Sequence, residues 1–74
     1  AFNIDLSASQ NSYRIEDFGV SGDIVYLLGD PTADYSIDIS GADSIVSVIE
    51  TLQVQTTVIT VVGVDLDSSH IAFI

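Results

Sequence analysis

The side chains with the greatest capacity for chemistry in this chain are carboxylates. Eleven Asp and Glu residues stand against a single basic side chain, Arg14, and the formal net charge is −10. The segment Asp65-Leu66-Asp67-Ser68-Ser69 places carboxylates on alternate residues and follows them with hydroxyls. Carboxylate, hydroxyl and carbonyl oxygens are the ligands that Ca²⁺ prefers, with roughly six to eight around each ion. A loop of this composition can therefore surround a calcium ion.

Calcium is accordingly the candidate cofactor of this chain, and its acidic turns are the candidate binding site. The 65–69 loop differs from a helix–loop–helix calcium loop, because it lacks the glycine and the final bidentate glutamate of that motif. The chain also lacks the Gly-Gly-x-Gly-x-Asp repeat of calcium-binding β-rolls. The alternative is that the carboxylates form solvated turns that bind no ion. The candidate ligands are, in order of preference, Asp65 and Asp67, followed by Asp17, Asp23 and Asp30.

The chain offers little for catalysis. It has one His, no Cys and no Lys. A Ser-His-Asp arrangement could use His70 with Asp65 or Asp67, but few neighbouring residues would support His70 so close to the end of the sequence. No nucleophile elbow, phosphate-binding loop or dinucleotide fingerprint is present. We expect a protein that is not an enzyme, with His70 at the end of a strand and facing water.

The composition argues against several classes of partner. Phosphate binding requires clustered Lys and Arg, so nucleic acid and anionic membranes are not expected partners. No apolar run reaches the ~20 residues of a membrane-spanning helix. An apolar content of 47% argues against disorder, and the absence of Cys excludes disulfides and thiolate metal sites. The expectation is a folded polyanion whose carboxylates repel one another at low salt and are screened by salt or divalent cations.

Alternation of apolar and polar residues indicates β-strands. The longest alternating run extends from Leu52 to Leu66, and a period of two over this length is a strand signature that no helix reproduces. Residues 42–52 fit a helical stripe capped by Asp43 or Ser44, but their Ile and Val content also fits a strand. We assign this segment to a short helix or an irregular turn. Shorter runs predict further strands in residues 2–6, 13–18, 24–28, 35–39 and 70–74.

The predicted fold is all-β, or mainly β with at most one short helix, as a compact antiparallel sandwich or roll of five to seven strands. Turn signals at Gly22-Asp23 and at Gly29-Asp30-Pro31-Thr32 separate the strands. We expect one domain, residues 1–74, in which residues 60–74 form the C-terminal strand segment. The side chains expected to be mostly buried are Phe2, Ile4, Ile15, Ile24, Tyr26, Ile37, Ile39, Val54, Val58, Val62 and Phe73.

The 52–66 segment also bears on association between chains. It carries no charge from Gln53 to Val64 and contains neither Lys nor Pro, so on a sheet edge it would lack the residues that prevent pairing with another chain. In the centre of a sheet the same composition would be ordinary. A chain of 74 residues without disulfides buries only about 60–65% of its unfolded surface and is marginally stable alone. We therefore expect the chain's principal partner to be itself.

Two segments resemble parts of repeats-in-toxin proteins. Residues 13–27 are similar to the stretch that follows the β-roll in that family, through Ile15-Glu16-Asp17-Phe18 and the run from Gly22 to Leu27. Residues 60–74 look like the carboxyl end of the same proteins, with Gly63-Val64-Asp65, a short polar loop and a few apolar residues. The glycine-rich calcium repeats of the family are missing. The resemblance implies export by a type I system, whose ATP-driven exporter reads an uncleaved C-terminal signal, and a secreted or cell-surface location.

Two functions from different classes follow. In the first, the chain is a secreted, non-enzymatic structural subunit that self-assembles into an extracellular filament, matrix fibre or surface layer, aided by divalent cations. The C-terminal segment 70–74 would then lie at or near the contact. In the alternative, the chain is a monomeric calcium-binding adhesion or carrier module exported by a type I system. A subunit of a phage or virion particle would share the self-assembly but not the secretion signature.

Overall fold

Short strands joined by turns make up most of the molecule, for which a computed structural model describes residues 1–19 and 21–74. The mainly β class predicted from the alternation is confirmed. Among the described residues the helical element is one 3-10 turn, η1 (Ser68–His70), and none of their helices is long and apolar enough to cross a membrane. The strands are β1 (Phe2–Asp5), β2 (Ser12–Ile15), β3 (Val25–Leu28), β4 (Asp34–Ser40), β5 (Asp43–Ile49), β6 (Thr56–Val61) and β7 (Ile71–Phe73).

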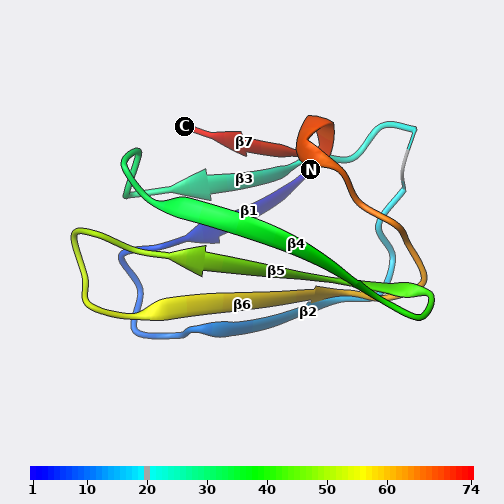
Figure 1. Ribbon diagram of the computed structural model, residues 1–74. Coiled ribbons are helices and arrows are strands. Elements are labelled where there is room, and N and C mark those ends of the chain that lie inside the picture. Colours follow the sequence, from blue (N-terminus) through cyan, green and yellow to red (C-terminus); the bar gives the residue numbers. More distant parts are fainter. Residues whose placement is uncertain (20) are drawn as a thin grey trace.

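The strands form two sheets, which lie one above the other in Figure 1. One sheet has the order β1-β3-β7, and its pairs are parallel. The other has the order β2-β6-β5-β4, with β2 parallel to β6 and antiparallel pairing of β5 with both β6 and β4. The predicted antiparallel arrangement is therefore wrong for the three-stranded sheet. The chain enters the other sheet between β1 and β3, so these neighbours are two strands apart in sequence and run in the same direction.

The apolar core lies between the two sheets, and both sheets contribute to it. Of the side chains predicted to be buried, Ile4 and Ile15 belong to this core. Two were predicted wrongly: Ile39 is 51% exposed, and Val54 is fully exposed. Ile39 lies near the end of a strand at the sheet border, and Val54 lies in a connection outside the sheets. The remaining predicted residues are only partly buried, namely Phe2, Ile24, Tyr26, Ile37, Val58, Val62 and Phe73.

The predicted long strand 52–66 is wrong in its extent. β6 comprises Thr56–Val61 only, and the longest strands are β4 and β5 with seven residues each. Residues 50–55 instead form the connection between β5 and β6. Within β6 the buried side chains are Thr57, Ile59 and Val61, while Val58 lies half-buried on the opposite face. Since both faces of β6 carry β-branched residues, the alternation alone could not decide which face would be buried.

The short helix or irregular turn assigned to residues 42–52 is also wrong, because the segment forms β5. β-Branched Ile and Val side chains favour a strand, and β5 pairs with β4 along its full length and with β6 from Ser44 to Ile49. The hairpin between β4 and β5 turns on Gly41-Ala42. Gly41 has a φ of 64° and no other residue of this turn has a positive φ, which is the pattern of a type II′ turn.

Candidate functional site: an acidic end and an open sheet edge

Four of the five predicted metal ligands lie at one end of the molecule. Asp17 and Asp23 lie between β2 and β3, whereas Asp65 and Asp67 lie between β6 and η1. Because β2 is parallel to β6 and β3 is parallel to β7, both connections occur at the same end, on the right in Figure 1. Asp30 follows β3 at the opposite end. The described residues include no group of three or more His, Asp or Glu side chains close enough to hold a metal ion.

Asp67 and His70 form a capping box around η1. The Asp67 carboxylate accepts hydrogen bonds from the backbone N–H of Ser69, at 2.9 Å, and from the Ser69 hydroxyl. In return, Nδ1 of His70 accepts a hydrogen bond of 3.1 Å from the backbone N–H of Asp67. The hydrogen bonds from Ser69 hold the pKa of Asp67 below its ordinary value. The Asp67 carboxylate is thus hydrogen-bonded to Ser69, which stabilises the start of η1.

The His70 ring supports the local structure around η1 and packs against Phe18. Its Nδ1 accepts a hydrogen bond from Asp67 N–H and lies 3.4 Å from Asp67 Oδ1. A Ser-His-Asp triad requires the other tautomer, in which Nδ1 donates to the aspartate. The ring packs edge-on against Phe18, with the ring centroids 5.7 Å apart, and the side chain is 15% exposed. The prediction that His70 faces water is wrong.

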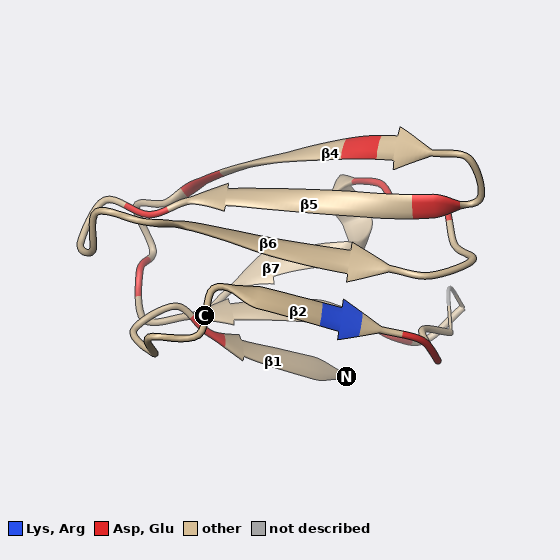
Figure 2. Ribbon diagram, turned by 90° about the horizontal axis from the view of Figure 1, so that it is seen from below, with Lys and Arg blue, Asp and Glu red and all other residues tan. Residues whose placement is uncertain are grey.

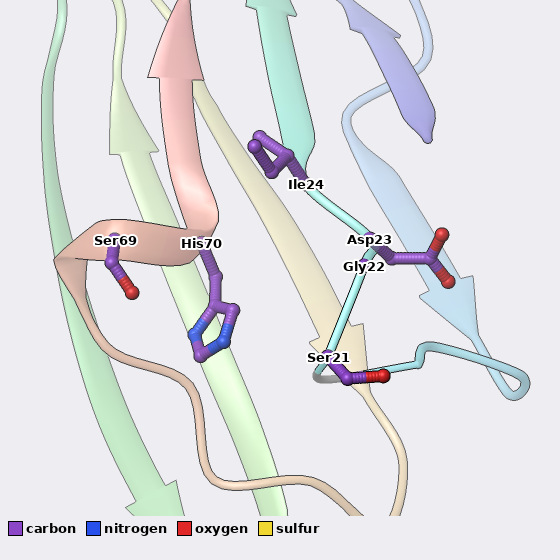
Figure 3. A pocket seen from close by; sticks show the side chains of 6 residues that line it. All are labelled: Ser21, Gly22, Asp23, Ile24, Ser69 and His70. Carbon is purple, nitrogen blue, oxygen red and sulfur yellow. The ribbon is translucent and has the colours of Figure 1, made fainter.

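An open cavity of about 270 Å³ separates η1 from the β2–β3 connection. Figure 3 shows Ser69 and His70 on one side of it and residues 21–24 on the other, with the Asp23 carboxylate directed away from His70. Asp23 accepts a hydrogen bond of 2.8 Å from Gly19 N–H and lies 3.2 Å from the amino group of Ala1. These contacts, that with Gly19 foremost, lower the pKa of Asp23. Since the polar groups around the cavity do not converge on one point, we assign no reaction to it.

Asp30 joins two connections at the opposite end of the molecule. Its side chain is 2% exposed, and its Oδ2 accepts hydrogen bonds from the backbone N–H groups of Thr51 and Leu52, at 2.7 and 3.0 Å. Its Oδ1 accepts from Thr32 N–H and from the Thr32 hydroxyl, at 3.2 and 2.8 Å. The Leu52 N–H, with support from Thr32 and Thr51, holds the pKa of Asp30 far below its usual range. These donors occupy its oxygens, and the geometry favours a structural clamp.

Glu50 is a second buried carboxylate at this end, and no motif in the sequence predicts its burial. Its Oε2 accepts hydrogen bonds from the Thr57 hydroxyl, at 2.5 Å, and from Gln55 Nε2, at 3.0 Å. Gln55 also donates to the carbonyl of Ala8, which connects this cluster to the β1–β2 connection. Glu50 Oε1 has no hydrogen-bond partner among the described residues. A buried charge with an unpaired oxygen is costly.

Replacing Glu50 by Gln is therefore expected to raise the free energy of unfolding by about 1 kcal/mol at neutral pH. The amide oxygen retains the two accepted hydrogen bonds. The substitution also removes a buried negative charge from a chain whose net charge is −10. Urea denaturation measures the change. The matched control is Glu16→Gln, since Glu16 is exposed and pairs with exposed Arg14 at 2.9 Å, so its effect should stay within about 0.5 kcal/mol. A lower stability of Glu50→Gln than of this control would contradict the argument.

The longest strand at a sheet border among the described residues is β4, and its outer edge is open. β4 ends the four-stranded sheet and forms its outer border in Figure 2. In the described part of the chain, no backbone hydrogen bond joins residues 34–40 to any segment other than β5. The other strands at sheet borders, β1, β2 and β7, contain only three or four residues. β6, which carries the uncharged segment, lies between β2 and β5 and is not an edge.

The type II′ hairpin determines which groups of β4 are open. In a two-residue hairpin the flanking residues, here Ser40 and Asp43, exchange both hydrogen bonds. Alternation along the ladder then directs the N–H and C=O groups of Tyr35, Ile37 and Ile39 away from β5. Their side chains lie on the core-facing side of the sheet, where Tyr35 packs against Phe73 of β7 with ring centroids 6.0 Å apart. The edge thus combines open backbone groups with an apolar row.

Comparison of the chain with protein-family models, with curated proteins and with solved structures gave no match.

Proposed function

We propose that the protein is a secreted, non-enzymatic structural subunit that self-assembles into an extracellular filament, matrix fibre or surface layer. The observation that carries this proposal is the open edge of β4. It is seven residues long, contains no Lys, Pro or bulge, and has a free side along its whole length among the described residues. Soluble proteins usually block such edges, because unpaired N–H and C=O groups are a template for pairing with another chain.

A polymer needs a second contact, and exposed apolar side chains supply a candidate. Four large hydrophobic residues that are more than half exposed lie at one end of the molecule, on the left in Figure 1: Ile49, Leu52, Val54 and Ile74. The acidic connections lie at the other end. Exposed apolar side chains are candidates for association surfaces. We propose that this end, which includes the residue following β7, forms the second contact.

We further propose that the fold of this subunit is a compact sandwich or roll. Its support is the arrangement of the two sheets with the apolar core between them (Figure 1). Export and an extracellular location are proposed from the resemblance of residues 60–74 to a type I secretion signal. A role for divalent cations is proposed from the net charge of −10, because screening of the carboxylates would favour association.

Sedimentation velocity and negative-stain microscopy test self-assembly. Purified protein should associate as its concentration rises from about 10 μM to 1 mM, and more strongly at about 0.5 M than at 0.01 M salt, where charges are poorly screened. Elongated or layered particles should appear in the micrographs. A cooperatively folded monomer under all of these conditions would contradict the structural role.

The calcium arm of the experiment separates specific binding from screening. NaCl and CaCl₂ are compared at equal ionic strength, and a chelator is added to matched samples. Greater association in CaCl₂ supports a specific calcium contribution, whereas equal association indicates screening alone. A monomer whose melting temperature rises with calcium would instead favour the adhesion or carrier module.

A further inference from the structure

The sequence of β4 is self-complementary about Ile37. β4 reads Asp34-Tyr35-Ser36-Ile37-Asp38-Ile39-Ser40, and the odd-numbered residues direct their backbone groups to the open edge. A second β4 that pairs antiparallel with this edge must place its own odd-numbered residues opposite them, because only those can exchange hydrogen bonds. The possible registers are therefore few, and each is defined by the residue that faces its own copy.

One register uses the whole strand. When Ile37 faces its own copy, all seven residues of β4 are paired and the three open residues of each strand can donate and accept. On the outer face, each aspartate then faces a serine: Asp34 lies opposite Ser40, and Asp38 lies opposite Ser36. On the core-facing side Tyr35 lies opposite Ile39, which is 51% exposed in the single chain. Aromatic and β-branched residues form favourable cross-strand pairs.

The neighbouring registers oppose like charges. When Ser36 faces its own copy, Asp34 lies opposite Asp38 twice, and when Asp38 is central, it faces itself. Each of these registers also leaves two residues of every β4 unpaired, because the strand has seven residues. Like charges directly opposite each other in a sheet are destabilising. Both the extent of pairing and the charge pattern thus select the register centred on Ile37.

We propose that β4 pairs with β4 of a second copy of this chain, antiparallel about a twofold axis at Ile37, so that the two four-stranded sheets become one continuous sheet. This inference rests on the proposed self-assembly and identifies one of its contacts. Such a contact is isologous, so it forms a dimer by itself and contributes to a polymer only together with the second, apolar contact. A ladder of this length is a small interface, and the dissociation constant should be on the order of 100 μM.

The contact should also depend on salt. In the selected register Asp38 lies diagonally across from Asp38 and Asp34 of the other copy, roughly 7–8 Å away on the exposed face. Asp38→Asn should therefore strengthen the association constant roughly three- to tenfold at low salt and reduce its salt dependence. Asp65→Asn makes the same change in net charge away from this edge and serves as the control. If both variants changed the association constant equally, the repulsion would come from the overall charge of the chain. That result would contradict a repulsion located at β4.

Cross-linking tests the register directly, because the chain contains no native Cys. Ser36→Cys mixed with Asp38→Cys should form disulfides between the two variants, since these residues face each other at a non-hydrogen-bonded position about 4.5 Å apart between Cα atoms. Ser36→Cys alone tests the register centred on Ser36, and Ser36→Cys mixed with Ser40→Cys tests that centred on Asp38. Dominant cross-links in either of the last two samples would overturn the proposed register.

A proline variant tests whether the edge is used at all. Ile37→Pro removes an N–H that points away from β5, so the β4–β5 ladder is retained, and association should weaken at least tenfold. A melting curve verifies that this variant is folded, and if it is not, the cross-links alone decide. Assembly that persists in folded Ile37→Pro, without 36–38 cross-links, would overturn this contact but leave self-assembly standing. A monomer under all conditions would overturn both.

Discussion

Replacement of Asp30 by Asn should lower the melting temperature by roughly 5–10 °C. The buried carboxylate accepts hydrogen bonds from two successive backbone N–H groups, those of Thr51 and Leu52, through the same oxygen. Thr32 donates to its other oxygen. An amide of the same shape would direct its own NH₂ group at donors on one of these sides. The substitution should therefore release the β5–β6 connection from the turn after β3.

The contribution of Asp30 has a defined pH dependence. Its pKa is depressed in the folded state, chiefly by the Leu52 N–H, relative to about 3.9 in an unfolded chain. The stabilisation is therefore fully present above the unfolded pKa and is lost as the pH falls toward the folded value. The difference in melting temperature between wild type and Asp30→Asn should be constant from about pH 5 to 8 and shrink below about pH 4. Circular dichroism melts measure both variants in a common series of buffers.

The control for Asp30 is Asp65→Asn. Asp65 is exposed in the connection between β6 and η1, and its replacement makes the same change in charge. Its melting temperature should stay close to that of wild type at every pH. A difference between wild type and Asp30→Asn that persists unchanged down to about pH 2 would show that the carboxylate does not act through its ionised form.

Local alternation was sufficient to locate several strands but not to order them. The predictions for residues 2–6, 24–28 and 35–39 correspond to β1, β3 and β4. Alternation indicates that a segment is extended, whereas sheet order depends on which strands meet after the chain has crossed between the sheets. The parallel pairs β1–β3 and β2–β6 could therefore not be obtained from a local pattern.

The candidate site was predicted in part for the same reason. The acidic turns are visible in the sequence, and the parallel pairs bring Asp17, Asp23, Asp65 and Asp67 to one end. The clamp at Asp30 could not be predicted, because its donors at residues 51 and 52 are distant in sequence. The open edge likewise follows from sheet order. The absence of charge in segment 53–64 made β6 the candidate edge strand, but β6 is central in its sheet. The observed edge strand is β4, which carries two aspartates.

The largest expected loss of stability follows from truncating a side chain on the buried face of β6. Ile59→Ala should lower the free energy of unfolding by about 3 kcal/mol, because Ile59 is fully buried between the sheets and its truncation leaves a cavity. Ile49→Ala removes the same atoms from a neighbouring strand where the side chain is 59% exposed, and it should cost less than about 1 kcal/mol. Urea denaturation at low salt and low concentration measures both variants in the monomer. Equal losses would contradict the assignment of the Thr57, Ile59 and Val61 face to the core.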